Sequence, residues 1–217
     1  MSPKNQASSG RTTVRRLPDR GFYDRETIYS ILDEGLLAHV GINTEQGPVV
    51  IPMLYGRDEE NLFLHGSPAS RLLREGGGVE LCVTVSLIDG LVIARSLFHH
   101  SMNYRSVVVM GEASPIEDLD ARSRALDLIS DHVIPGRVAG TRPHHEKEVR
   151  GTLVLSMSLT EASAKVRTGP PVDDEEDHEL DTWAGVLPLG IGVGTPIPDP
   201  QLREGITPPA HILQWRR

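Results

Sequence analysis

Short apolar segments separated by turn residues fill most of the chain after Leu36, and this pattern constrains the fold more than any other feature. Turn residues of hairpin length at 43–47, 57–61 and 89–90 separate neighbouring segments and favour antiparallel pairing. The expected strands cover residues 36–42, 49–55, 62–65, 79–88, 91–96, 105–113 and 152–166. Seven strands with few helices predict a mainly β fold of the barrel type.

Two helices are expected beside these strands. Residues 24–35 begin at Asp24, which can cap a helix, and stop at Gly35. Residues 117–133 carry apolar side chains at helical spacing, and Pro135 and Gly136 end the run. After Gly169 the chain is rich in proline, glycine and acidic residues, so we expect an extended tail there.

Composition sets the compartment and the broad class. The 217 residues, 38% of them hydrophobic, suit a folded protein that needs neither metal nor disulfide to hold its core. The single cysteine, Cys82, excludes an internal disulfide and multi-thiolate metal sites. The N-terminus lacks the apolar core of a secretory signal, and no apolar run is long enough to span a bilayer. We therefore expect a cytoplasmic protein without a membrane partner.

The net charge of −8 is concentrated in one place. Residues 173–181 hold seven acidic residues and neither lysine nor arginine, which leaves the rest of the chain close to neutral. Such a run is usually a solvated segment. The opposite bias at Arg11, Arg15, Arg16 and Arg20 is diluted by Gly, Ser and Pro and lacks aromatic interleaving. We expect a flexible arm there and no nucleic-acid partner.

The segment from His65 to Arg71 is the most informative for chemistry. A strand ends at His65 and Gly66, and a helix then starts with Ser67 as N-cap. The free N–H groups of a helix start form an anion site, to which Ser70 adds a hydroxyl and Arg71 a planar guanidinium. The segment therefore predicts a phosphate site. An ordinary capped helix with a surface arginine is the alternative.

Three further features bear on binding. Tyr104, Arg105 and Ser106 lie at the start of an otherwise apolar strand, where Arg105 needs an anionic or carbonyl partner and could equally be a salt-bridged structural residue. Pro52 cannot donate to a ladder, so its segment is an edge, a bulge, or backbone facing a ligand. Lys165 and Arg167 share one strand face and could point into a cleft or protect a solvated edge.

Other motifs carry less weight. The glycine run 190–194 is followed by Thr195 and Pro196 where a dinucleotide-binding helix would start. The adjacent histidine pairs at 99–100 and 144–145 lack the geometry of metal ligands, and no serine sits in a nucleophile elbow, so we expect no metal site. His65 stands beside the expected phosphate site and could contact a cofactor or its metal, contact a substrate, or be structural.

Six ordered motifs carry a family resemblance: GLLAHVGI, GPVVIPMLY, LFLHGSPASR, NYRSVVVMGEA, SAKVRTGPPVDDEED and WAGVLPL. Together they resemble the pyridoxamine-phosphate-oxidase-like family of FMN-binding split β-barrels, in its flavin-nucleotide-binding branch with the nitroimidazole-resistance reductases. The resemblance covers residues 17–189. It implies an antiparallel split β-barrel with flanking helices, working as a homodimer with the flavin at the interface.

The resemblance also assigns residues and boundaries. It implies that Val50, Ile51, Pro52 and Met53 lie along the isoalloxazine ring and that His65, Gly66, Ser67, Ser70 and Arg71 hold the phosphate. It also implies that Arg105 and Ser106, next to Tyr104, lie near the flavin, and that Trp183 approaches the partner subunit's flavin. Lys165 or Arg167 could add positive charge at the phosphate. The chain then divides into an arm at 1–20, an FMN-binding domain at 21–169, and an extension at 170–217 that could embrace the partner.

Two departures narrow the expected activity. Leu72 stands where oxidases of pyridoxamine phosphate usually carry lysine, and their C-terminal arginine motif is not recognisable, which puts the vitamin-B6 reaction in doubt. We expect an FMN-dependent oxidoreductase with a small-molecule electron donor and acceptor, and we name no protein acid or base as catalytic. The alternatives are a non-catalytic flavin or haem carrier and a relative using FAD or a deazaflavin coenzyme.

Overall fold

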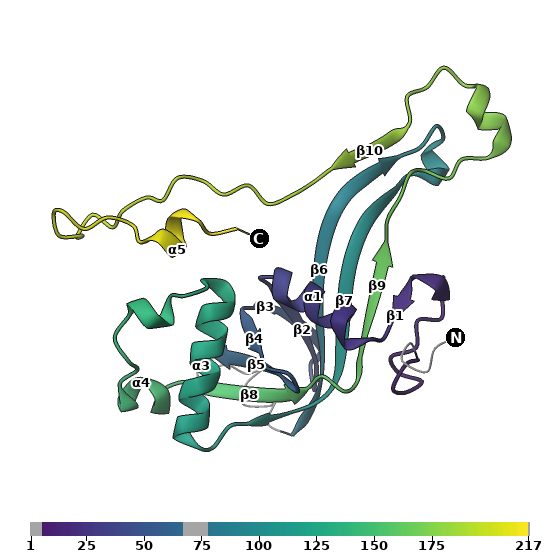
Figure 1. Ribbon diagram of the computed structural model, residues 1–217. Helices are drawn as coiled ribbons and strands as arrows, with labels where there is room; N and C mark the ends of the chain where they lie inside the picture. The colour runs from purple at the N-terminus through teal and green to yellow at the C-terminus, as the bar shows by residue number, and fades with distance from the viewer. Residues whose placement is uncertain (1–5, 67–77, 217) are drawn as a thin grey trace. The chain divides into compact units, whose positions relative to one another are not determined.

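The computed structural model describes residues 6–66 and 78–216, and the chain forms two compact units (Figure 1). Unit 1 comprises Met1–Gly35, Val83–Met110 and Glu161–Ile191. Unit 2 comprises Leu36–Cys82, Gly111–Thr160 and Gly192–Arg217. The predicted divisions of the chain after residues 20 and 169 stay predictions.

Hydrogen bonds join the described strands in the order β3-β2-β6-β7-β8-β5-β4, while β1 pairs with β9, β9 with β7, and β10 with β6. The strands are β1 Gly21–Phe22, β2 Ala38–Thr44, β3 Gly47–Met53, β4 Tyr55–Arg57, β5 Asn61–Gly66, β6 Val79–Ile93, β7 Ser101–Pro115, β8 Leu153–Ser158, β9 Ala162–Arg167 and β10 Gly185–Pro188. The path is open at β3 and β4 within the described residues. A mainly antiparallel β fold with flanking helices is confirmed.

Unit 1 contains the first predicted helix, α1 (Arg25–Glu34). Asp24 caps it by accepting a hydrogen bond from the Thr27 N–H at 2.8 Å. Its apolar face is buried through Ile28, Ile31 and Leu32. The unit also holds the short 3₁₀ turns η1 Pro18–Arg20, η2 Leu97–His99 and η4 Glu175–Glu179. The predicted helix is confirmed because its cap and its apolar spacing are both local signals.

Unit 2 is built around the second predicted helix, α3 (Leu119–Val133), which packs against β4, β5 and β8 (Figure 1). Its buried cluster joins Phe63, Ala125, Ile129 and Val154. Asp118 caps the helix through the Ala121 N–H at 2.8 Å. The remaining described elements of the unit are η3 Val138–Gly140, α4 Glu146–Arg150 and α5 Ala210–Leu213.

Two sequence expectations are wrong. Residues 89–90 are not a turn, because β6 runs through them and Gly90 pairs with Pro188 of β10. A Cβ at Gly90 would lie 2.9 Å from the Leu187 carbonyl oxygen, so this glycine permits a close strand rather than a bend. The single strand expected at 152–166 is two strands, β8 and β9, separated by residues 159–161.

The segment after Gly169 is less extended than expected, since it contains η4, β10 and α5. Within the described residues, no helix is both long and apolar enough to cross a membrane.

Candidate functional site

The predicted phosphate segment is only partly described. Ser67, Ser70 and Arg71 lie outside the described residues. His65 and Gly66 end β5 in unit 2, where they pair with Val154 and Leu153 of β8. The strand end predicted from the sequence is therefore confirmed, and the phosphate site that follows it stays a prediction.

His65 has an unusual environment. Its Nδ1 atom is buried and has no hydrogen-bond partner among the described residues. Burial lowers the pKa of the imidazole below its ordinary value of 6.5, which keeps the ring neutral at pH 7. A neutral imidazole is the form that accepts hydrogen bonds and ligates metals. His65 is thus chemically available rather than committed to a described structural contact.

Strand β3 carries the residues predicted to lie along a ring system. It stands at one end of the strand path and pairs only with β2 within the described residues. Such an edge strand tolerates Pro52, which has no N–H to donate to a second neighbouring strand. Val50 is 63% exposed and Pro52 is exposed, whereas Ile51 and Met53 are half-buried. The edge position expected from Pro52 is confirmed, and one face of β3 presents apolar groups to the surface.

Strands β7 and β9 bring a second group of predicted residues together in unit 1. Tyr104 pairs with Arg167, and Ser106 pairs with Lys165. The Ser106 hydroxyl donates to the Lys165 carbonyl oxygen at 3.3 Å. Tyr104, Ser106 and Lys165 are all half-buried.

Arg105 is held by two carboxylates. Its Nε and Nη2 atoms donate to Asp89 at 2.9 and 2.7 Å, Nη2 also donates to Glu34 at 2.8 Å, and Nη1 donates to the other Glu34 oxygen. The bonds to Glu34, and then those to Asp89, raise the pKa of Arg105 further above its ordinary value. The observed contacts are therefore those of a salt-bridged structural arginine, which was one of the two roles expected for Arg105. Its contact with a cofactor stays a prediction.

Arg167 does not extend from β9 into a cleft. It is only 7% exposed and donates to the carbonyl oxygens of Gly169 and Pro170, each at 3.0 Å, and to the Asn103 side chain. Desolvation is the main cause that lowers the pKa of its guanidinium. Trp183 is 66% exposed, and its ring lies against the backbone of Gly185. Arg167 is therefore a structural residue, and Trp183 is accessible.

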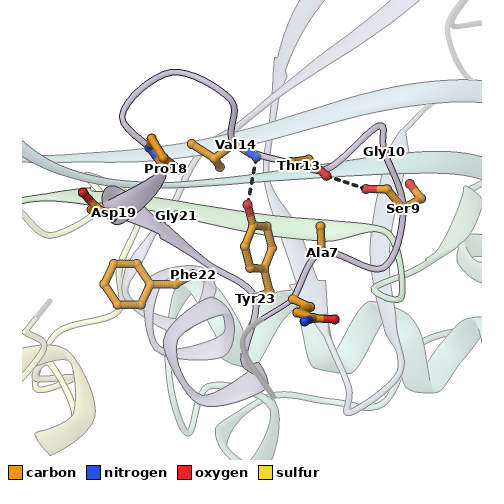
Figure 2. Close-up of a pocket in the computed structure, with 11 residues that line it drawn as sticks. Ala7, Ser9, Gly10, Thr13, Val14, Pro18, Asp19, Gly21, Phe22 and Tyr23 are labelled. Carbon is orange, nitrogen blue, oxygen red and sulfur yellow. Dashed lines mark hydrogen bonds between the residues drawn. The ribbon is translucent and has the colours of Figure 1, made fainter. Parts of the chain in front are cut away.

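The predicted site residues thus form two groups. Val50, Ile51, Pro52, Met53, His65 and Gly66 belong to unit 2, and Tyr104, Arg105, Ser106, Lys165 and Trp183 belong to unit 1. The sequence did not predict Glu34 and Asp89 as the partners of Arg105. They lie 71 and 16 residues away from it along the chain, and no local sequence pattern indicates an ion pair over such separations. The sequence also did not predict a cavity of about 840 Å³ at the N-terminal segment (Figure 2).

The comparisons with known proteins agree with this fold. The family model described as pyridoxamine 5'-phosphate oxidase matches residues 24–166. The chain belongs to the pyridoxamine 5'-phosphate oxidase family. No curated protein sequence matches the chain significantly.

Solved structures give more specific similarities. The flavocytochrome Anf3 from Azotobacter vinelandii is 44% identical, with 97% of this chain and 99% of that chain covered and a TM-score of 0.92. The FAD and haem binding protein from Mycobacterium smegmatis is 35% identical, with 89% and 96% covered and a TM-score of 0.86. A putative 5-nitroimidazole antibiotic resistance protein from Bacteroides thetaiotaomicron is 27% identical, with 67% and 86% covered and a TM-score of 0.56.

Proposed function

We propose that this protein binds a flavin nucleotide and acts as a flavin-dependent oxidoreductase. The observation that carries the proposal is the 44% identity to a flavocytochrome over 97% of the chain, with a TM-score of 0.92. A similarity that covers nearly the whole of both chains includes the segments that would form a cofactor site as well as the scaffold. When bound, the flavin supplies hydride or electron transfer, and the protein orients it and shapes its surroundings.

The described residues fit a planar ligand. The exposed apolar side chains on β3 offer a flat strip, and the edge position of Pro52 leaves backbone there without a strand partner. These residues would lie along the ring, with the phosphate at the segment from Gly66 to Arg71. Arg105 would act from a distance, because Glu34 and Asp89 engage its guanidinium.

Two observations bear on which flavin is bound, and they point to different nucleotides. The sequence motifs favour FMN, whereas a protein 35% identical to this chain is described as binding FAD. We include both nucleotides in the proposal, and mass spectrometry of the released chromophore distinguishes them.

Haem is a second cofactor that a specific observation favours. Two similar proteins are described as a flavocytochrome and as an FAD and haem binding protein. In this chain the orphaned Nδ1 atom of His65 marks an imidazole without a committed partner among the described residues, and its lowered pKa keeps it unprotonated. His65 is therefore the residue that we propose to bind haem iron.

We further propose that the protein works as a homodimer in the cytoplasm. Leu97 and Phe98, at the turn between β6 and β7, are 88% and 89% exposed. Two large adjacent apolar side chains with this exposure favour a covered position in an assembly.

The absorption spectrum of the purified protein tests the cofactor proposals together. Flavin gives a two-banded visible spectrum, and haem adds an intense Soret band. His65→Ala should remove the Soret band while the flavin bands persist. His145→Ala is the matched control, since His145 is exposed just before α4 and belongs to neither proposed cofactor site, and it should leave both features unchanged. A Soret band that survives in His65→Ala would overturn the haem assignment but leave the flavin proposal standing.

A further inference from the structure

A second cavity, of about 420 Å³, lies in unit 2 between helix α3 and the loop that leads from it to α4 (Figure 1). Side chains of α3 form one wall, and residues 137–144 of the loop form the other. The volume falls within the range of about 300–1,000 Å³ that is usual for small-molecule sites. None of the described residues proposed for flavin or haem lines this cavity, so it has no assigned ligand.

Hydrogen bonds hold the two ends of the loop in place. At its start, the Asp131 side chain of α3 accepts from the Val138 N–H at 2.9 Å. At its end, both carboxylate oxygens of Glu148 in α4 accept from the Arg142 guanidinium. The cavity is therefore shaped before a ligand arrives, which reduces the entropy lost on binding.

The helix wall carries polar side chains along one face of α3. Ser123, Asp127 and Ser130 recur at helical spacing, so they extend over about two turns, or roughly 10 Å, of the helix. The Ser123 hydroxyl makes no hydrogen bond with another described residue. Asp127 accepts from the His144 ring through Oδ1, at 3.1 Å from Nε2, while its Oδ2 atom has no described partner. This wall thus offers one free hydroxyl and one free carboxylate oxygen.

The loop wall supplies positive charge. Arg137 and Arg142 both line it, but Glu148 already pairs with Arg142. The Arg137 side chain is exposed and makes no hydrogen bond or ion pair with another described residue. Its planar guanidinium is therefore available for the bidentate hydrogen bonds that an oxyanion accepts.

We infer that this cavity binds a small phosphate monoester that carries hydroxyl groups. A phosphate group has three terminal oxygens, which accept from the Arg137 guanidinium and the Ser123 hydroxyl. The hydroxyl groups of the ligand donate to Asp127 Oδ2 on the helix wall.

The size and charge of the cavity favour such an ester over inorganic phosphate. A volume of 420 Å³ is many times the share of about 30 Å³ that one water molecule takes in the liquid, so it leaves room for an organic part. An anion without hydroxyl groups would leave the Asp127 carboxylate unsatisfied beside a second negative charge. Arg137 therefore favours the phosphate end of the ligand, and Asp127 favours its hydroxyl end.

Calorimetric titration of the protein as purified tests the inference, with glycerol 3-phosphate, ribose 5-phosphate and glucose 6-phosphate as probes. At least one ester should bind, and more tightly than inorganic phosphate. Arg137→Ala should weaken this binding by about tenfold or more, because the charge-assisted contacts are lost. Arg124→Ala is the matched control, since Arg124 is exposed on the same helix but does not line the cavity, and it should leave the affinity unchanged.

Asp127→Asn tests the hydroxyl contact separately. The amide keeps the size of the side chain but removes its charge, so hydroxyl groups are held less strongly and an anion is repelled less. The ratio of ester affinity to inorganic phosphate affinity should therefore fall. An unchanged ratio would overturn the assignment of Asp127 to the hydroxyl end of the ligand.

The proposed flavin site is also expected to hold a phosphate, so Arg71→Ala is the variant that separates the two sites. It should leave ester binding intact. Binding that is lost in Arg71→Ala but kept in Arg137→Ala would overturn the inference. It would also be overturned if none of the three esters bound, or if inorganic phosphate bound as tightly as the esters. A purified protein without flavin that still binds an ester through Arg137 would contradict only the proposed flavin function.

Discussion

At the scale of single residues, Arg105 shows where sequence reasoning stops. An arginine at the start of an apolar strand needs a partner, and that requirement is visible in the sequence. The identity of the partner is not, because Glu34 and Asp89 reach Arg105 only through the fold. His65 is similar: its position at a strand end is predictable, but the orphaned ring nitrogen depends on tertiary burial.

Replacing Arg105 tests whether its ion pairs stabilise unit 1. Arg105→Met leaves Glu34 and Asp89 without their cation, so the free energy of unfolding should fall by about 1 kcal/mol, a modest value because all three groups are partly exposed. Urea denaturation measures it. The loss should shrink at high salt, which screens exposed pairs.

Arg124 provides the control because it is exposed and forms no ion pair with a described residue, and Arg124→Met should not change stability. Equal stability of the two variants would mean that the Arg105 contacts contribute nothing. The flavin content of Arg105→Met checks the separate prediction that this residue lies near the cofactor.

At the scale of elements, local signals were enough for the helices and not for every strand. The caps at Asp24 and Asp118 and the apolar spacing after them place α1 and α3 close to the predicted ranges. A glycine in the sequence is ambiguous, however, because it occurs both in turns and where another backbone segment packs too closely for a side chain. Gly90 belongs to the second kind, and only its pairing with strand β10 in the structure shows this.

Gly56 offers a test of such a close approach inside unit 2. A Cβ at this position of β4 would lie 2.7 Å from both the N and Cα atoms of Ile129 in α3. Backbone atoms of a helix cannot move aside as the end of a flexible side chain can. Gly56→Ala should therefore lower the free energy of unfolding by about 2–4 kcal/mol.

Gly41→Ala on β2 is the matched control, since its new Cβ would meet the nearest atom at 3.5 Å, an ordinary contact. Thermal denaturation of both variants provides the measurement. A Gly56→Ala protein as stable as Gly41→Ala would contradict the packing of α3 on β4.

At the scale of the whole molecule, the ordered motifs are sufficient to indicate the family, because their order along the chain reflects strand order and turn positions together. They could not reveal the N-terminal cavity, whose lining residues come from a segment without regular periodicity. The predicted cofactor residues also belong to two different units of the fold, and no local sequence pattern predicts this division.

The proposed dimer is testable at this scale. Leu97→Ser/Phe98→Ser removes the exposed apolar pair beside η2 and should convert a dimer to a monomer in light scattering coupled to size exclusion. Leu37→Ser changes an exposed apolar residue (44% exposed) outside both the η2 turn and the C-terminal extension, and it should leave the dimer intact. A dimeric double variant would show that another surface holds the subunits together.

The most direct test of the central claim is to denature the purified protein and identify the chromophore that it releases. The account predicts a yellow or orange protein that yields a flavin nucleotide in near-stoichiometric amount. A colourless protein that yields no flavin and binds neither added FMN nor added FAD would contradict it.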